Sequence, residues 1–316
     1  MRYRSVISLL AVFSVLGMTE PVHAGSESGG QTGTLYRFGS GAHVLGFGGA
    51  VVSLAHDPVS VLFNPSGAAL GGKGKLVASH TRLPMDRSIN VIGFGRQIDQ
   101  RAGFAVTWVN AGVDGLVRYD ASGNADGSLS NSENAVAFSF GTRVGPQVLA
   151  GVTAKWYQMS LDGRTAANWM LSAGMTFSPS PNVRIGVTAR DVGGDIGWFT
   201  ERPQGQLEID DPFPRTVALG VSYTAPSLGV TGALNYENVN MDGTYLHLGV
   251  SWLVVERLRL RAGYRWIELG EGSREPALTS GATVRFPFGD GSIGIDYSAM
   301  QDVFGLAHTI GLRFDV

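Results

Sequence analysis

The chain ends in a segment whose side chains alternate in character from one position to the next. Residues 309–316 read TIGLRFDV, and Ile310, Leu312 and Phe314 stand two positions apart. Successive side chains of a β-strand point to opposite faces, so these three residues would share one face. Because the alternation continues to the last residue, we expect the chain to end in a strand that closes a sheet.

The same alternation recurs along the chain after residue 72. In residues 103–108, for example, Phe104, Val106 and Trp108 alternate with small or polar residues. About fourteen such segments can be recognised, and bacterial single-chain barrels have an even number of strands. The 45 glycines and the charged fraction of 16% favour β-structure over a helical membrane protein. With a net charge of −2, a nucleic-acid partner is not expected.

Alternation alone does not distinguish a soluble sandwich from a membrane barrel, but the lengths of the connections do. Short connections and longer ones alternate along the chain, the short ones at 97–100, 144–146, 178–181, 225–227, 253–255 and 289–290, the longer ones at 110–131, 160–166, 191–212 and 268–276. Short periplasmic turns and long external loops are typical of outer-membrane barrels. We therefore predict an all-β fold, a transmembrane antiparallel β-barrel of about fourteen strands in residues 73–316, in the bacterial outer membrane.

Aromatic residues near the ends of the predicted strands fit the aromatic girdles of such a barrel. The residues expected to face lipid in this way are Tyr223, Trp252, Tyr264, Trp266 and Tyr297. In a soluble protein they would be ordinary core residues.

Residues 1–24 have the features of a secretory signal peptide. Arg2 and Arg4 precede an apolar stretch at 6–18, and the small-residue site Val22-His23-Ala24 follows it. The stretch is shorter than the ~20 residues that a spanning helix needs. We expect cleavage after Ala24. The chain has no cysteine, so neither disulfides nor thiolate chemistry is expected.

A segment rich in glycine and turn residues precedes the predicted barrel. Residues 25–34 read as a flexible lead-in, and we expect residues 25–72 as a whole to form this lead-in and a small plug. Its motif residues permit close backbone approach or favour turns, and they are Gly46, Gly48, Gly49, Asp57, Asn64 and Pro65. A nucleotide site is not expected, because the third glycine of a dinucleotide-binding fingerprint is missing.

These motifs also carry a resemblance. The order Leu-Gly-x-Gly-Gly-Ala at 45–50, Asp-Pro at 57–58 and Asn-Pro-Ser-Gly at 64–67 resembles the N-terminal segment of the PorV/PorQ branch of the FadL-like outer-membrane proteins. Segments 213–216, 260–264 and 294–298 also look like this family. The resemblance implies a plug inside a fourteen-stranded barrel.

The resemblance implies two alternative functions. PorV-type proteins act as shuttles or anchors in type IX secretion, whereas FadL proteins pass hydrophobic compounds. It therefore implies a non-enzymatic role in secretion-linked docking or transport, with passive uptake of hydrophobic or anionic amphiphilic compounds as the alternative. The expected partners are outer-membrane lipid and either secretion-system proteins or a hydrophobic or anionic small molecule.

The strand expected at 257–266 places basic side chains on its inner face. The arginines expected to line a ligand site in the lumen are Arg257, Arg259, Arg261, Arg265, Arg285 and Arg313. Such a lumen would attract anions. The alternative, which is usual in polar lumens, is that the arginines pair with acidic residues, here Glu237, Asp296 and Asp57. The small Gly263 is expected to leave a gap beside the arginines.

The sequence offers little for catalysis. The histidines after the signal peptide show no metal-ligand spacing, and they are His43, His56, His80, His247 and His308. Residues 122–133 approach a calcium-binding loop, but Ser122 stands where aspartate is needed, and a solvated loop is the better interpretation. We predict no catalytic residue, no metal and no cofactor. A Ser–His pair that meets only in the folded chain remains the alternative.

Overall fold

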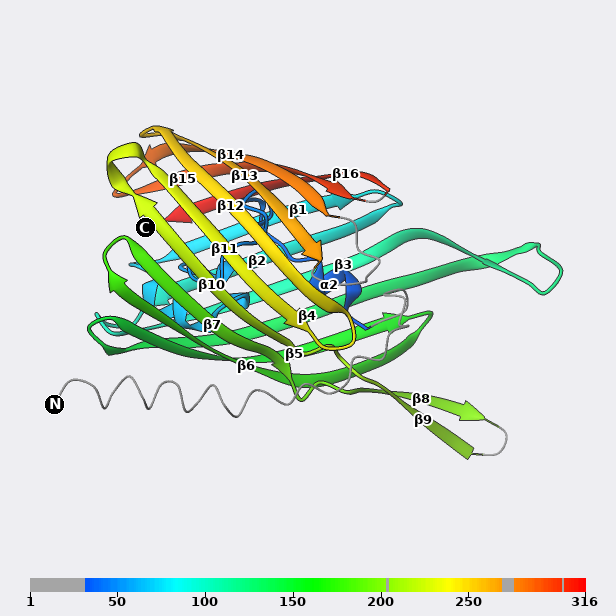
Figure 1. Cartoon of the computed structure of the whole chain (residues 1–316). Helices are drawn as coiled ribbons and strands as arrows, with labels where there is room; N and C mark the ends of the chain where they lie inside the picture. Colours follow the sequence, from blue (N-terminus) through cyan, green and yellow to red (C-terminus); the bar gives the residue numbers. More distant parts are fainter. Residues whose placement is uncertain (1–31, 203–204, 269–275, 303) are drawn as a thin grey trace.

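The computed structural model describes residues 32–202, 205–268, 276–302 and 304–316. Fourteen antiparallel strands form a closed barrel (Figure 1), which confirms the predicted fold class. Each barrel strand pairs with its neighbours in sequence, except that β7 pairs with β10 and β1 pairs with β16. The predicted signal peptide at 1–24 lies outside the described residues.

The barrel strands are β1 (Lys75–Leu83), β2 (Arg87–Gln97), β3 (Ala102–Tyr119), β4 (Ala125–Gly145), β5 (Val148–Leu161), β6 (Arg164–Ser180), β7 (Val183–Val192), β10 (Thr216–Ala225), β11 (Val230–Val239), β12 (Gly243–Val255), β13 (Leu258–Glu268), β14 (Ala277–Phe288), β15 (Gly291–Asp302) and β16 (Gly305–Asp315). A separate hairpin consists of β8 (Ile196–Arg202) and β9 (Gly205–Asp211).

The last strand closes the barrel, as the end of the sequence predicts. Strand β16 pairs with β1 from Lys75 opposite Asp315 to Arg82 opposite His308. On its outer face, Ile310 is 61% exposed, whereas Arg313 on its inner face is 3% exposed. The closure leaves no free edge between the first and last barrel strands, so every barrel strand has two hydrogen-bonded neighbours.

The wall is apolar outside and polar inside. Large apolar side chains such as Phe138, Leu171 and Val250 are exposed, while Lys155 and Asp296 are buried. This distribution is the reverse of that in a soluble sandwich, and it fits a wall whose outer face contacts lipid.

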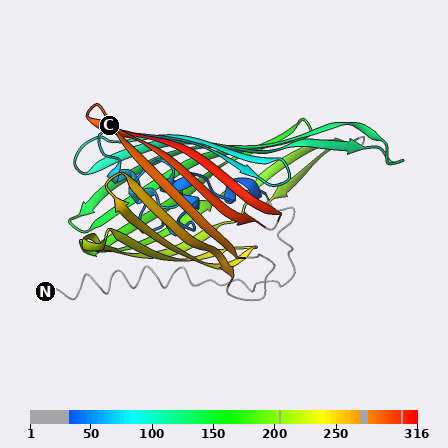
Figure 2. The ribbon, with the colours of Figure 1, turned by 90° about the horizontal axis from the view of Figure 1, so that it is seen from above.

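The two ends of the barrel differ. The connections β2–β3, β4–β5, β6–β7, β10–β11, β12–β13 and β14–β15 are short and lie at one end, which we call the short-turn end. At the other, long-loop end, β3 and β4 project far beyond the barrel (Figure 2). The predicted loops at 110–131 and 160–166 are therefore mostly strand, because β3 and β4 continue to pair as far as Tyr119 opposite Ala125, and β5 and β6 as far as Leu161 opposite Arg164. Residues 125–133 of the calcium-like segment belong to β4.

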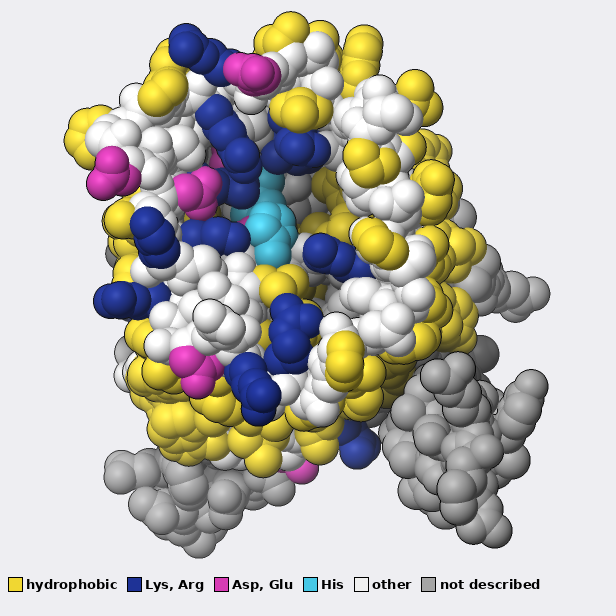
Figure 3. Space-filling model, turned by 90° about the vertical axis from the view of Figure 1, so that its left-hand side faces the viewer, with side chains coloured by type: hydrophobic (Ala, Val, Ile, Leu, Met, Phe, Trp, Pro, Cys, Tyr) yellow, Lys and Arg dark blue, Asp and Glu magenta, His cyan; other side chains and the backbone are white. Residues whose placement is uncertain are grey.

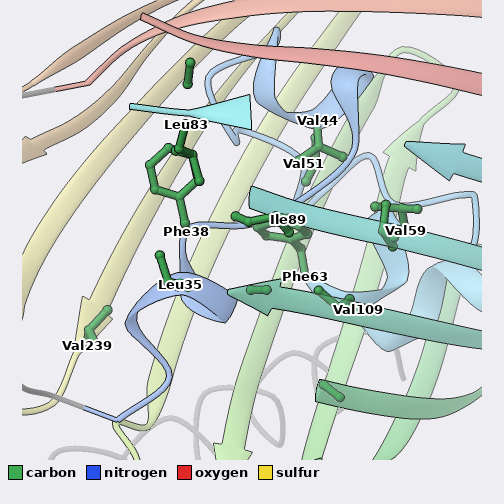
Figure 4. Packing of buried hydrophobic residues seen from close by; sticks show 14 of the residues in the cluster. Leu35, Phe38, Val44, Val51, Val59, Phe63, Leu83, Ile89, Val109 and Val239 are labelled. Atoms are coloured by element: carbon green, nitrogen blue, oxygen red, sulfur yellow. The ribbon is translucent and has the colours of Figure 1, made fainter. Parts of the chain in front are cut away.

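Residues 32–72, which we call the luminal segment, are almost entirely buried and pack against the inner face of the wall (Figure 4). The segment contains α2 (Thr34–Arg37), α3 (Ala42–Leu45), η1 (Ser60–Leu62) and η2 (Pro65–Leu70). Phe38, Val44 and Phe63 of the segment belong to the same apolar cluster as Ile89 and Val109 of the wall. None of the helices in the described part of the chain is long and apolar enough to cross a membrane.

Wall glycines allow the luminal segment to approach the strands closely. A Cβ atom at Gly103 would lie 2.2 Å from the carbonyl oxygen of Ala68, and one at Gly186 would lie 2.4 Å from that of Val52. Both contacts are too short for any larger residue. Gly103, Gly141, Gly151 and Gly174 face one another in succession across β3 to β6. The high glycine content thus reflects close contact between a wall and the backbone inside it.

Candidate functional site

The luminal segment crosses β13 at Gly263. A Cβ atom at Gly263 would lie 2.5 Å from the amide nitrogen of Gly48. The gap that the sequence led us to expect beside Gly263 is therefore filled, and that expectation was wrong. The crossing separates Arg259 and Arg261, toward the short-turn end, from Arg265, toward the long-loop end. The six predicted arginines do not form one group.

A β-bulge changes the direction of side chains at the end of β13. Leu248 pairs with Tyr264, but Leu246 pairs with Ile267, so one extra residue is accommodated between them. Trp266 takes a positive φ of 55°. Both Arg265 and Trp266 are consequently buried. The expectation that Trp266 faces lipid was wrong, whereas the other four predicted girdle residues are exposed on the outer face.

Asp296 holds two of the predicted arginines. Arg313 Nη2 lies 3.0 Å from Asp296 Oδ2, and Arg261 Nη1 lies 3.9 Å from Asp296 Oδ1. Arg261 also donates to Thr283 Oγ1 at 2.6 Å, and the Thr283 hydroxyl donates to Asp296. The predicted pairing of arginines with Asp296 is thus present in the structure.

The remaining arginines at the short-turn end have fewer partners. Arg259 Nη1 donates to Ser251 Oγ at 3.0 Å, and the backbone N–H of Arg285 donates to the carbonyl oxygen of Arg257 at 2.8 Å. Within the described ranges, none of these three arginines forms an ion pair. We call Arg257, Arg259, Arg261, Arg285 and Arg313 the mouth cluster. Figure 3 shows a hollow at this end, bordered by Lys and Arg side chains, with His side chains inside it.

Arg265 belongs to a different group, on the long-loop side of the luminal segment. Its guanidinium lies 4.1 Å from the ring centre of Trp266 and 5.5 Å from that of Phe38. Nearby, Arg190 Nη2 lies 2.7 Å from Glu237 Oε2, so Glu237 pairs with an arginine outside the predicted six. A cavity of about 50 Å³ is lined by Arg190, Glu237, His247, Arg265 and Trp266, among others.

Side chains of the wall hold the three motif glycines by their carbonyl oxygens. Thr279 Oγ1 donates to Gly46 O at 3.3 Å, and Asn235 Nδ2 donates to Gly49 O at 3.2 Å. His247 Nδ1 lies 3.2 Å from Gly48 O. Gly48 and Gly49 both have positive φ, which other residues adopt with strain. Sequence reasoning missed these wall residues as anchors, although alternation marks them as inward and polar.

Asp57 organises the middle of the luminal segment. Its Oδ1 accepts from the backbone N–H groups of Val59 and Ser60, each at 3.0 Å. Its Oδ2 lies 2.8 Å from His43 Nε2. Burial acts to raise the pKa of this carboxyl, but His43, and less strongly His56 and Arg313, hold the pKa well below its usual value. The close partner of Asp57 is thus a histidine of its own segment, not one of the six arginines.

Asn64 and Pro65 tie the same segment to the wall. Asn64 Nδ2 donates to the carbonyl oxygens of Val52 at 2.7 Å and Met175 at 3.1 Å. Asn64 Oδ1 accepts from the Ser66 backbone N–H at 3.1 Å, so Asn64 caps η2, and Pro65 is its first residue. The motif therefore has a structural explanation in this chain.

Further contacts join α2 to the long-loop end. Arg37 Nη2 lies 2.6 Å from Asp242 Oδ2, and the backbone N–H of Tyr36 donates to Glu133 Oε2 at 3.0 Å. Lys155 Nζ donates to the Tyr36 hydroxyl at 2.8 Å and pairs with Asp191. In the described part of the chain, no group of three or more His, Asp or Glu side chains is arranged to hold a metal ion.

Comparisons with known proteins agree with this geometry. No protein-family model and no curated protein matches the sequence. Among solved structures, the Pseudomonas putida toluene transporter TodX superposes with a TM-score of 0.62 at 13% identity, covering 87% of this chain and 96% of TodX. The Ralstonia pickettii toluene transporter TbuX superposes with a TM-score of 0.58 at 13% identity, covering 87% of this chain and 97% of TbuX. A Pseudomonas aeruginosa FadL homologue superposes with a TM-score of 0.56 at 13% identity, with the same coverage as TbuX.

The chain has the FadL-type barrel fold. With its apolar outer wall, this closed barrel is a bacterial outer-membrane protein. The comparisons support the FadL-like part of the resemblance and do not show the PorV/PorQ branch.

Proposed function

We propose that this protein provides a passive route for hydrophobic small molecules across the outer membrane, with the luminal segment as its plug. One observation carries the proposal: the chain forms a closed barrel with a buried segment in its lumen. The barrel has the fold of toluene transporters. Short turns of such barrels face the periplasm, so the long loops would face outside. Of the two functions that the sequence resemblance implies, this is the uptake alternative.

Passage through the lumen requires the luminal segment to move, because its backbone touches the wall at glycines such as Gly103, Gly186 and Gly263. The contacts of α2 with Asp242, Glu133 and Lys155 are the first that a molecule from outside would meet. Leu35 and Tyr36 of α2 also pack in the apolar cluster, but a displacement of this one short helix breaks fewer contacts than release of the whole core around Val44 and Phe63. We place the entry step at α2.

Uptake of radiolabelled toluene tests the proposal. Cells with an intact outer membrane that express the protein should take up toluene faster than matched cells that lack it. A variant with Phe314→Asp, which we expect to fail in barrel assembly, serves as the expression control. Equal uptake with and without the assembled barrel would contradict the proposal, and secretion-linked docking would then be the function to test.

A further inference from the structure

The mouth cluster contains more cationic groups than the wall around it can neutralise. Asp296 is shared by Arg261 and Arg313. Arg259 and Arg285 form no ion pair within the described residues. Asp57 of the luminal segment and Asp315 lie near Arg313, and Asp315 also lies opposite Lys75 of β1. Like charges that converge without counterions repel one another, so the arrangement favours binding of an anion.

The register of the strands brings two of these arginines to the same place. Arg285 faces Gly294 across β14 and β15, and Gly294 faces Arg313 across β15 and β16. A Cβ atom at Gly294 would lie 3.6 Å from Cβ of Arg313 and 3.9 Å from Cγ of Arg285. Because Gly294 has no side chain, nothing of β15 stands between the two arginines.

Arg313 also has an unused donor. Its side chain is 3% exposed, and its Nε has no hydrogen-bond partner. A buried guanidinium donor without an acceptor is costly, and an oxygen atom of an anion beside Arg285 would satisfy it. Guanidinium groups suit carboxylate and phosphate oxygens in particular, because they donate two parallel hydrogen bonds.

We propose that Arg259, Arg285 and Arg313 form a binding site for a small oxyanion, a carboxylate or phosphate group, at the short-turn end of the lumen. Arg313 is 3% exposed, so the surface of a docked protein would not reach it, and Figure 3 shows a hollow bordered by Lys and Arg side chains at this end. The site goes beyond the proposed function, since a neutral hydrocarbon offers nothing for it to bind. The anion is either free or the charged end of an amphiphile.

Calorimetric titration of the full chain in non-ionic detergent, at constant ionic strength, tests the site. The probes are inorganic phosphate and octanoate, and neutral octanamide is the chemical control. Arg259→Gln combined with Arg285→Gln should weaken binding about tenfold or more, because charge-assisted hydrogen bonds are lost. This variant leaves the ion pairs of Asp296 in place, so the barrel should still fold. Arg118→Gln, at an exposed arginine of β3, should bind as the wild type does.

The probes also identify the source of the anion. Saturable phosphate binding that the double substitution weakens supports a free oxyanion, and the same result with octanoate alone supports an amphiphile. Saturable binding of neither probe would overturn the site. So would binding that the double substitution leaves unchanged, or octanamide binding as tight as that of octanoate. Toluene uptake reports separately on the proposed function.

Discussion

Gly48 of the luminal segment lies directly against Gly263 of β13, so closely that a Cβ atom at Gly263 would be 2.5 Å from the amide nitrogen of Gly48. This contact divides the basic face of β13 in two. Arg261 on one side pairs with Asp296, while Arg265 on the other stacks on Trp266. One glycine pair thus separates the mouth cluster from the charged groups of the long-loop side.

Gly263→Ala should therefore weaken the docking of the luminal segment. The added methyl group meets backbone, which cannot move aside alone, and we expect a loss of about 1–3 kcal/mol. Thermal unfolding in detergent measures it. Gly232→Ala is the matched control, since no atom lies within 4 Å of a Cβ atom there. If both variants unfold at the wild-type temperature, the contact at Gly263 does not hold the segment.

Alternation in the sequence was enough to predict the strands, the closing role of β16 and the inward direction of Arg259, Arg261 and Arg313. It failed at Trp266, because the bulge inserts one residue and the alternation of faces restarts after it. It also could not show what fills the space beside Gly263, because a small residue in a strand does not identify its neighbour. Asp57 lies in an irregular segment, where no periodicity indicates its partner.

Asp57→Asn should lower stability in a way that depends on pH. The folded-state pKa of Asp57 lies below its usual value, so the carboxylate stabilises the fold fully above pH ~4 and loses this effect as the pH falls through the folded pKa. The substitution should lower the unfolding temperature at pH 7 and make less difference at low pH. Asp290→Asn, in an exposed turn, is the control. A difference that does not change with pH would contradict the assigned role of the charge.

Phe314→Asp should impair assembly. Phe314 is on the lipid-facing side of β16, opposite Leu76 and Ile293, and a carboxylate on the lipid face costs up to about 2–4 kcal/mol depending on its depth. Heat-modifiable migration in gels should show less folded barrel. Val316→Asp, just beyond the strand, should assemble normally. Normal migration of the Phe314 variant would show that closure does not depend on this residue.

The orientation can be tested with single cysteines, since the chain has none of its own. Ser122→Cys at the tip of the β3–β4 hairpin should react with an impermeant reagent on whole cells. Gln147→Cys, in the short turn between β4 and β5, should react only after lysis. The opposite pattern would place the long loops in the periplasm.

Locking the luminal segment to the wall tests most directly whether molecules pass through this lumen. Ser66 Oγ and Thr176 Oγ1 of β6 lie 2.8 Å apart, so cysteines at both positions are close enough to form a disulfide. Ser139 and Thr153, whose oxygens lie 2.7 Å apart on β4 and β5, provide a control disulfide within the wall. We predict that oxidation of the Ser66→Cys/Thr176→Cys variant stops uptake of radiolabelled toluene and that reduction restores it, with no change for the control pair. Uptake by the oxidised variant at the rate of its reduced form would contradict a passage that requires η2 of the luminal segment to leave the wall.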